Sequence, residues 1–302
     1  MKRIKSIMMC AFALLTFCAL FANVQTVHAA SYVNGNIYVN PVEDVKGNIK
    51  DCKKVRVTTY ADSISSFDVR YGSGDKIANL KVNKKGLEAR VTDTENYSSY
   101  GEADISLYAT KPATYKVSFD VVNSKNQKRG HYIVQVQAVN SSSVIKKAVF
   151  GKQTVESNSA SIKKGVKKNS SKSSYKVKGK SGKFKITANS QYKITGIVVV
   201  SVNKKGQYVY KKFKNGKKLA LSQNYDSIST DAYWGITSKP LKKYTYIYVS
   251  YKDKFFGHTQ TYSISKARGR KEIKSVYKNG ITGSRTTNYY RRPSATIELW
   301  QY

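Results

Sequence analysis

Apolar and polar residues alternate in several stretches of this chain, and the alternation limits the fold more than any other feature of the sequence. The segment Tyr115–Val121 reads Tyr-Lys-Val-Ser-Phe-Asp-Val, which places every second side chain on one face of an extended strand. β-Branched and aromatic runs at 131–139, 194–202 and 244–251 have the same strand character. Because no stretch after residue 29 shows a sustained 3.6-residue period, we predict an all-β protein.

Positive charge is concentrated in the second half of the chain. The 302 residues include 54 Lys and Arg against 18 Asp and Glu. Residues 30–140 carry 16 basic and 12 acidic residues, whereas residues 141–302 carry 35 and 6. We therefore predict two domains, a near-neutral one at 30–142 and a strongly basic, Tyr-rich one at 143–302.

Residues 1–29 have the pattern of a secretory signal peptide. A basic start at residues 2–5 precedes an almost unbroken apolar run at Ile7–Ala22, and small residues stand before a cleavage site after Ala29. The run is shorter than the ~20 residues that a membrane span requires. We expect a secreted protein without a membrane span, which charge alone would retain on the cell surface. Its single remaining cysteine, Cys52, cannot form a disulfide within the chain.

Short sequence matches suggest that the second domain is a duplicate of the first. Val-Asn-Lys-Lys-Gly occurs at 82–86 and again at 202–206, and Gly-His occurs at 130–131 and at 257–258. The offsets are nearly the same in both cases. This interpretation places the two histidines at equivalent turns or strand starts, outside any catalytic site.

The stretch Thr110–Val121 resembles the closing half of bacterial immunoglobulin-like domains, which often read Pro-Gly-x-Tyr-x-Val. Tyr115 and Val117 match this pattern, while Ala113 stands in place of the glycine. The resemblance covers about residues 76–139 and implies that the Tyr115 hydroxyl bonds to upstream backbone in a tyrosine corner. It implies two immunoglobulin-like β-sandwich domains in tandem, a fold used by spacers, adhesive modules and binding scaffolds.

No motif in the sequence indicates an enzyme or a cofactor. The chain lacks a Gly-x-Ser-x-Gly elbow and a His-Glu-x-x-His motif. Asp226 and Asp231 leave open a carboxylate pair of the kind that glycosidases use. An acidic stretch suits either a calcium ion or a solvated loop; its members are Asp93, Glu95, Glu102 and Asp104. We predict a non-enzymatic protein with no cofactor and no metal.

Positive charge interleaved with aromatic residues is the strongest functional signal. The segment Tyr210–Lys218 is expected to form a hairpin with a type I′ turn at Asn215-Gly216, which would place Lys214 opposite Lys217. Arg presents a planar fork that fits phosphate or sulfate, and a neighbouring Tyr can stack on sugars or bases. The predicted polyanion-binding residues are Lys211, Lys212, Lys214, Lys217, Lys218, Arg268, Arg270, Lys271, Arg291 and Arg292, and the predicted aromatic contacts are Tyr210, Tyr289 and Tyr290.

The excess charge calls for a partner, because like charges on one domain repel each other and destabilise its compact state. We expect the second domain to dock on an anionic polysaccharide, a teichoic acid or a sulfated glycan of the cell wall or the host. No pattern of a sequence-specific nucleic-acid-binding fold is visible. The main competing hypothesis is a secreted host-protein-binding factor, a receptor or immunoglobulin binder that uses a Tyr-rich sandwich face. The same sequence is also compatible with a charge that serves only solubility, with a cationic toxin and with a hydrolase that has a hidden triad.

Overall fold

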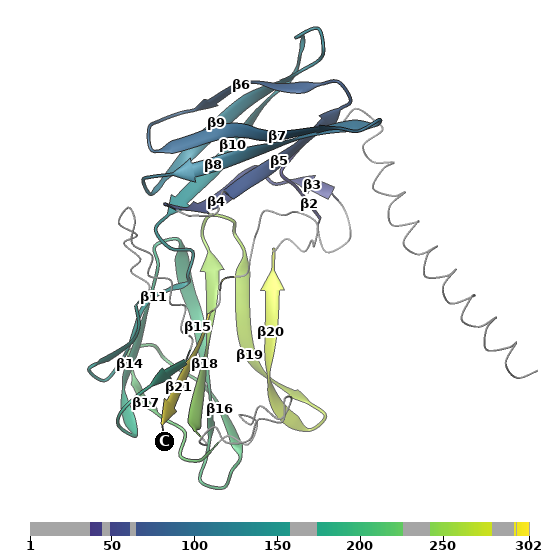
Figure 1. The fold of residues 1–302 in the computed structure, drawn as a ribbon. Coiled ribbons are helices and arrows are strands. Elements are labelled where there is room, and N and C mark those ends of the chain that lie inside the picture. The colour runs from purple at the N-terminus through teal and green to yellow at the C-terminus, as the bar shows by residue number, and fades with distance from the viewer. Residues whose placement is uncertain are drawn as a thin grey trace, which may run out of the picture.

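The structure is a computed structural model, and it describes residues 37–43, 49–60, 65–157, 174–225, 242–279, 293 and 295–301. These residues form strands, turns and loops without any helix, which confirms the predicted all-β class. Figure 1 shows two groups of strands, an upper one in purple to blue and a lower one in green to yellow. We call them the N-terminal half (residues 37–139) and the C-terminal half (residues 144–301).

The N-terminal half consists of two four-stranded sheets and one separate strand pair. The first sheet has the order β1-β5-β8-β7, with β1 at Tyr38–Val39, β5 at Ser65–Gly72, β8 at Tyr100–Ala109 and β7 at Leu87–Asn96. The second has the order β4-β10-β9-β6, with β4 at Lys54–Thr58, β10 at Lys128–Val139, β9 at Ala113–Val122 and β6 at Lys76–Val82. The separate pair is β2 (Pro41–Glu43) with β3 (Ile49–Asp51).

The C-terminal half also consists of two sheets. The smaller sheet has the order β12-β11-β14-β17, with β12 at Gln153–Ser157, β11 at Ile145–Phe150, β14 at Ser181–Ala188 and β17 at Lys218–Ala220. The larger sheet has the order β13-β21-β18-β15-β16, with β13 at Ser174–Lys176, β21 at Thr296–Gln301, β18 at Lys243–Asp253, β15 at Tyr192–Val202 and β16 at Tyr208–Lys212. A hairpin of β19 (Thr259–Ala267) and β20 (Arg270–Lys278) extends from β18.

Strand pairing follows the same plan in both halves. An early strand pairs parallel with the last strand of its half, β4 with β10 and β13 with β21, whereas the neighbours are antiparallel. The order β4-β10-β9-β6 thus has its counterpart in β13-β21-β18-β15. The chain passes from β10 to β11 through residues 140–144, and the domain boundary after residue 142 stays a prediction.

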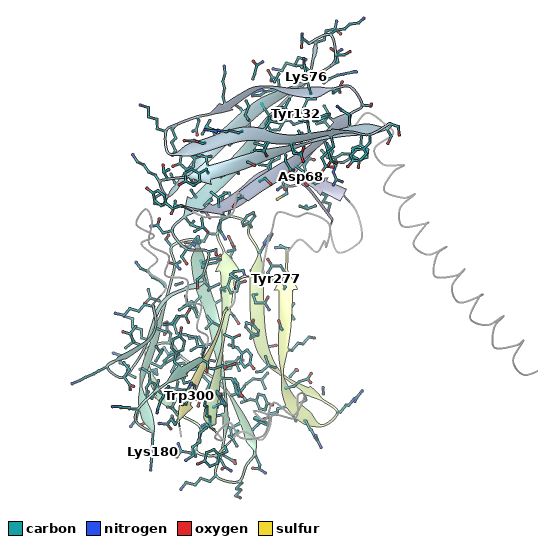
Figure 2. All side chains as sticks on the ribbon, viewed as in Figure 1. Asp68, Lys76, Tyr132, Lys180, Tyr277 and Trp300 are labelled. Carbon is teal, nitrogen blue, oxygen red and sulfur yellow. The ribbon has the colours of Figure 1, made fainter. Side chains whose placement is uncertain are left out.

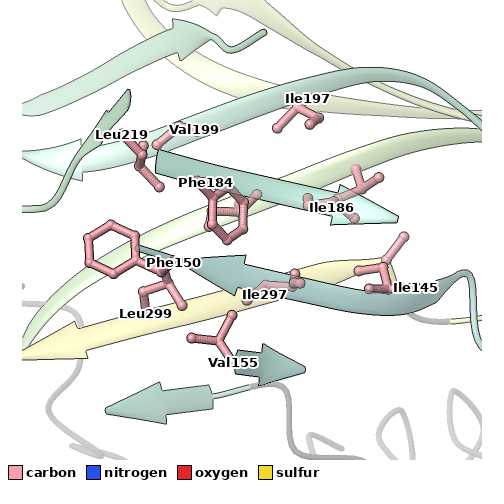
Figure 3. Close-up of a cluster of buried hydrophobic side chains, with 14 of the residues drawn as sticks. Ile145, Phe150, Val155, Phe184, Ile186, Ile197, Val199, Leu219, Ile297 and Leu299 are labelled. Carbon is pink, nitrogen blue, oxygen red and sulfur yellow. The ribbon is translucent and has the colours of Figure 1, made fainter. Parts of the chain in front are cut away.

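Each half has its own hydrophobic core, built by the alternation seen in the sequence. Val117, Phe119 and Val121 of β9 are fully buried in the first core, while the residues between them face outward. In the C-terminal half, Phe184 and Ile186 of β14 pack between the sheets against residues of β15 and β21 (Figure 3). Since the described residues contain a single cysteine, hydrophobic packing rather than disulfides stabilises these cores.

The tyrosine corner expected from the sequence is confirmed. The Tyr115 hydroxyl donates a 2.8 Å hydrogen bond to the carbonyl oxygen of Lys111, four residues upstream, and the side chain is only 1 % exposed. Gly86 lies against this hydroxyl with a φ of +107°, and a Cβ at Gly86 would come within 2.6 Å of it. Together with the strand order, this corner assigns an immunoglobulin-like fold to the N-terminal half.

The two sequence matches differ in what they mark. Val-Asn-Lys-Lys-Gly begins at the last residue of β6 and of β15, which are counterparts in the two sheets, so this match marks equivalent positions. The Gly-His pairs do not. His131 lies within β10, 2.7 Å from Asp120, whereas the Gly-His pair at 257–258 lies in the turn between β18 and β19. The hydrogen-bond pattern within the turn at 203–207 is the same as that within the turn at 123–127, and it differs from that of the segment after Asn83. In both of these turns one Asn carboxamide bonds to the backbone two and four residues on, so the same turn chemistry recurs at places that are not equivalent in the strand order.

Candidate functional site

The predicted hairpin at Tyr210–Lys218 is wrong. Its first strand, β16, pairs with β15 in the larger sheet, whereas its second strand, β17, pairs with β14 in the smaller sheet. The segment between them crosses from one sheet to the other. Lys214 and Lys217 are therefore exposed residues of a crossing turn, and they do not form a cross-strand pair.

Asn215 explains why the chain crosses here. Its side chain accepts a hydrogen bond from the Ile186 amide and donates one to the Ile186 carbonyl, both at 2.8 Å, as a neighbouring strand would. The Lys217 amide bonds to the Lys214 carbonyl at 3.2 Å, and of the two central residues only Gly216 has a positive φ, +84°. This is the geometry of a type II turn, which needs glycine at its third position, and not of type I′.

Lysines line the outer surface of the smaller sheet. Lys183 and Lys185 point outward from β14, because Phe184 and Ile186 point into the core. Lys218 of β17 lies directly opposite Lys183, and Lys147 of β11 lies opposite Thr187 of β14. We call this surface the lysine face; its members are Lys147, Lys183, Lys185 and Lys218, and all four are exposed. Only Lys218 was predicted, although the Lys-Phe-Lys-Ile alternation of β14 carries the signal for two others.

The cluster at 266–271 occupies the tip of the β19–β20 hairpin. Arg268 and Gly269 have positive φ values of +49° and +75°, and Ala267 pairs with Arg270, as in a two-residue type I′ turn. Lys266 lies opposite Lys271 across the hairpin. The like-charge pair that we expected at 214 and 217 thus occurs here. Like charges in this position repel each other, so an anion bound between them would be stabilising.

The remaining predicted residues are divided between two surfaces or lie outside the described ranges. Tyr210 and Lys212 point away from the core on β16, since they pair with Val200 and Val198, while Lys211 pairs with the core residue Val199 on the opposite side. Outside the described residues lie Tyr289, Tyr290, Arg291, Arg292, the acidic residues Asp226 and Asp231, and the predicted signal peptide at 1–29. Figure 2 shows the side chains of the described residues.

A buried ion pair joins the two halves. The Arg56 guanidinium of β4 binds the Asp253 carboxylate at the end of β18 through two contacts of 2.7 and 3.0 Å. Asp253 is fully buried, and its carboxylate also accepts the amides of Phe255 and Phe256. The guanidinium lies 5.0 Å from the Phe256 ring centroid and donates 2.9 Å to the Tyr192 hydroxyl. The charges are therefore paired and hydrogen-bonded, as buried charges require.

The connecting residues between the halves are also held by hydrogen bonds. The carbonyls of Ser141, Ser142 and Ser143 accept bonds of 2.6 to 2.8 Å from side chains of the C-terminal half. The donors are Gln191, Tyr192 and Asn189, respectively. The connection is thus part of the packed C-terminal half and not a free linker.

A groove of about 740 Å³ lies beside this ion pair. Its lining includes Cys52, Lys54, Lys116, Phe256 and His258, which come from both halves. Burial raises the pKa of the Cys52 thiol, so the thiol stays protonated and is a poor nucleophile. Burial also lowers the pKa of His258, whose Nδ1 lies 3.0 Å from the Tyr277 hydroxyl, so this imidazole is neutral at pH 7.

The acidic residues of the first sheet lie on strands and not in a loop. Asp68 of β5 and Asp104 of β8 are directly opposite each other, and Asp93 of β7 pairs with Asp104 on its other side. Burial and a hydrogen bond with Asp68 raise the pKa of Asp104 to about 6. No group of three or more His, Cys, Asp or Glu residues within the described ranges has an arrangement that could hold a metal ion.

No protein-family model and no curated protein matches this chain. Similar solved structures include WR4, a C. elegans MSP family member (14 % identity, TM-score 0.22, covering 29 % of this chain and 93 % of that one). They also include the fibronectin(III)-like modules of Clostridium thermocellum CbhA (13 % identity, TM-score 0.25, covering 74 % of this chain and 87 % of that one). A third is the secreted serine protease VesC from Vibrio cholerae (10 % identity, TM-score 0.22, covering 55 % of this chain and 42 % of that one). The immunoglobulin-like assignment rests on the strand order and the tyrosine corner. Across the residues that the structure describes, no helix is long and apolar enough to cross a membrane.

Proposed function

We propose that this protein is a non-enzymatic binding protein that acts outside the cell, and that its C-terminal half docks on an anionic polymer. The observation that supports this most directly is the lysine face. Lys183 and Lys218 lie side by side on neighbouring strands, although like charges in this position are destabilising. The strands β14 and β17 contain no acidic residue that would compensate these charges. A bound polyanion supplies the missing counter-charge.

The binding mode that follows is electrostatic. Lysine side chains on a strand surface reach outward as flexible point charges, which suits polymers whose phosphate, sulfate or carboxylate groups have irregular spacing. The exposed cluster at the tip of the β19–β20 hairpin adds Arg268, Arg270 and Lys271. Such contacts release counterions, so affinity falls steeply with salt.

The experiment is a comparison of two triple variants of the full chain that remove the same charge. Lys183, Lys185 and Lys218 are changed to Ser in one, and the exposed Lys76, Lys85 and Lys125 of the N-terminal half in the other. We measure affinity for polyphosphate at several NaCl concentrations. The lysine-face variant should bind about tenfold more weakly and with a smaller salt slope, since each exposed contact contributes up to about 1 kcal/mol. Equal behaviour of the two variants would reject the proposal for this face.

A further inference from the structure

The crossing turn contains a dipeptide that is chemically reactive in an open chain. Asn-Gly occurs at 34–35, 215–216 and 279–280, and the structure describes both residues of the second pair only. Asparagine deamidates readily before glycine, because glycine has no side chain to hinder attack by its own amide nitrogen on the carboxamide. Lys214 and Lys217 flank the pair at 215–216, and their positive charge favours loss of the amide proton that precedes this attack.

The fold holds the group that would be attacked. The carboxamide oxygen of Asn215 accepts the Ile186 amide, and its nitrogen donates to the Ile186 carbonyl, each at 2.8 Å. Deamidation first closes a five-membered ring between this side chain and the next backbone nitrogen. Ring closure rotates the carboxamide, so both hydrogen bonds to β14 have to break before the reaction can begin.

The fold also holds the nitrogen that would attack. The Gly216 amide donates a 2.8 Å hydrogen bond to the Phe184 carbonyl, and this N–H is the one that has to lose its proton. The Phe184 amide in turn bonds to the Lys217 carbonyl at 2.9 Å. On the other side of the turn, the Phe213 amide bonds to the Ile197 carbonyl of the larger sheet, also at 2.9 Å. The pair is therefore unreactive while the turn stays on both sheets.

The strand that follows the turn is the element most able to separate. β17 consists of three residues, Lys218–Ala220, and it lies at the edge of the smaller sheet. Among the described strands it pairs with β14 alone. Short edge strands with few hydrogen bonds open at a lower free energy than the strands of a core.

We propose that Asn215 is a deamidation site that the fold keeps closed and that opens when β17 separates from β14. The Gly216 nitrogen then attacks the side-chain carbonyl carbon, so that a C–N bond forms, the bond to the side-chain nitrogen breaks and ammonia leaves. Water opens the resulting succinimide to aspartate or isoaspartate. The net reaction consumes one water and releases one ammonia, and it needs no oxidant and no second protein.

The product does not restore the closed turn. A carboxylate at this position still accepts the Ile186 amide, but it has no hydrogen to donate, and its second oxygen faces the Ile186 carbonyl. Isoaspartate also lengthens the backbone by one carbon. Deamidation therefore makes a transient separation of β17 permanent. Because Lys218 belongs to β17 and pairs with Lys183 of β14, the modification also takes one residue out of the lysine face.

The test compares the deamidation rate of Asn215 in folded and unfolded full-length chain. Both samples are incubated at pH 8.5, one of them in guanidinium chloride, and peptide mapping by mass spectrometry follows the conversion. We expect the folded protein to react at least about a hundredfold more slowly, because only open molecules react. Equal rates in the two samples would overturn the closure of this site by the fold.

A matched pair of variants tests which opening matters. Leu219→Ala removes a buried side chain of β17, and Leu107→Ala removes one from β8 of the N-terminal half; the two leucines are 4 % and 3 % exposed. Circular dichroism confirms folding. Leu219→Ala should raise the folded-state rate at least about tenfold, and Leu107→Ala should change it less than about twofold. Equal acceleration by both variants would overturn the separation of β17 as the opening step.

A last measurement examines the product without relying on any rate. Asn215→Asp introduces the aspartate directly, and it should unfold at a lower guanidinium concentration than the wild type and be cleaved faster by protease near β17. Asn279→Asp makes the same charge change at an exposed residue of the same half and should have neither effect. An Asn215→Asp protein as stable and as resistant as the wild type would overturn the proposal that deamidation fixes the separated state.

Discussion

Asp68 and Asp104 show how a single pair of residues links stability to pH. Their carboxyl groups lie on neighbouring strands and share a hydrogen bond, and burial is the largest cause of the raised pKa of Asp104. Because the pKa is about 6 in the folded state and near 4 in an unfolded chain, the folded protein binds the proton more tightly. The contribution to stability is present below pH 4 and is lost as the pH rises through 6.

Asp104→Asn removes the loss of stability that occurs above pH 6, because the amide keeps a hydrogen bond to Asp68 without a second negative charge. The variant should unfold at a higher urea concentration than the wild type at pH 7.5, and the difference should disappear at pH 4. Glu88→Gln on the exposed surface of β7 is the control and should show no such crossover. Equal urea midpoints of Asp104→Asn and the wild type at pH 7.5 would contradict the expected repulsion.

Within single elements, the alternation of the sequence predicted the strands well: Tyr115–Val121 lies within β9, and the runs at 131–139, 194–202 and 244–251 lie within β10, β15 and β18. It did not predict which strands pair. Asn215-Gly216 fits a type I′ hairpin as well as the observed type II turn, because both place glycine at a positive φ. The choice depends on Ile186, 29 residues away, whose backbone bonds to Asn215. A local pattern has no access to such a distant partner.

The same limit applies to the candidate site. Positive charge is concentrated in the second half by sequence count, and the prediction grouped the residues of the site by proximity along the chain. The lysine face joins Lys147, Lys183 and Lys218 through strand register. Faces of a sheet become visible only when the pairing is known.

Asn215→Ala tests the crossing turn directly. The substitution removes two hydrogen bonds to Ile186 and leaves its amide and carbonyl without these partners, at about 1 kcal/mol for each bond. We expect the free energy of unfolding to fall by about 2 kcal/mol in urea titrations. Lys214→Ala, at the exposed neighbouring position, should change it by less than about 0.5 kcal/mol. Similar losses in both variants would show that the Asn215 contacts do not anchor the segment.

At the scale of the whole molecule, the Arg56–Asp253 pair determines how the halves stay together. Removing one partner leaves a buried charge without its counter-ion, which typically costs about 3–5 kcal/mol. Arg56→Met should therefore lower stability and expose the connection at residues 140–144 to proteases. The double variant Arg56→Met/Asp253→Leu should regain part of the loss, because no unpaired charge then remains. Unfolding in urea and limited proteolysis measure both effects, and an Arg56→Met protein as resistant as the wild type would contradict this role.

The joint between the halves has a mechanical consequence. In Figure 1 the strands of the N-terminal half run from side to side, and those of the C-terminal half run from top to bottom. Rotation of one half against the other would break the Arg56 contacts to Asp253 and Tyr192 and the Lys54 hydrogen bond to the Phe255 carbonyl at the same time. The two halves thus keep a fixed orientation and are not joined flexibly. With its basic half flat on a polymer-coated surface, it would hold the near-neutral half at one fixed tilt, so that a pull on that half is passed to the surface as torque.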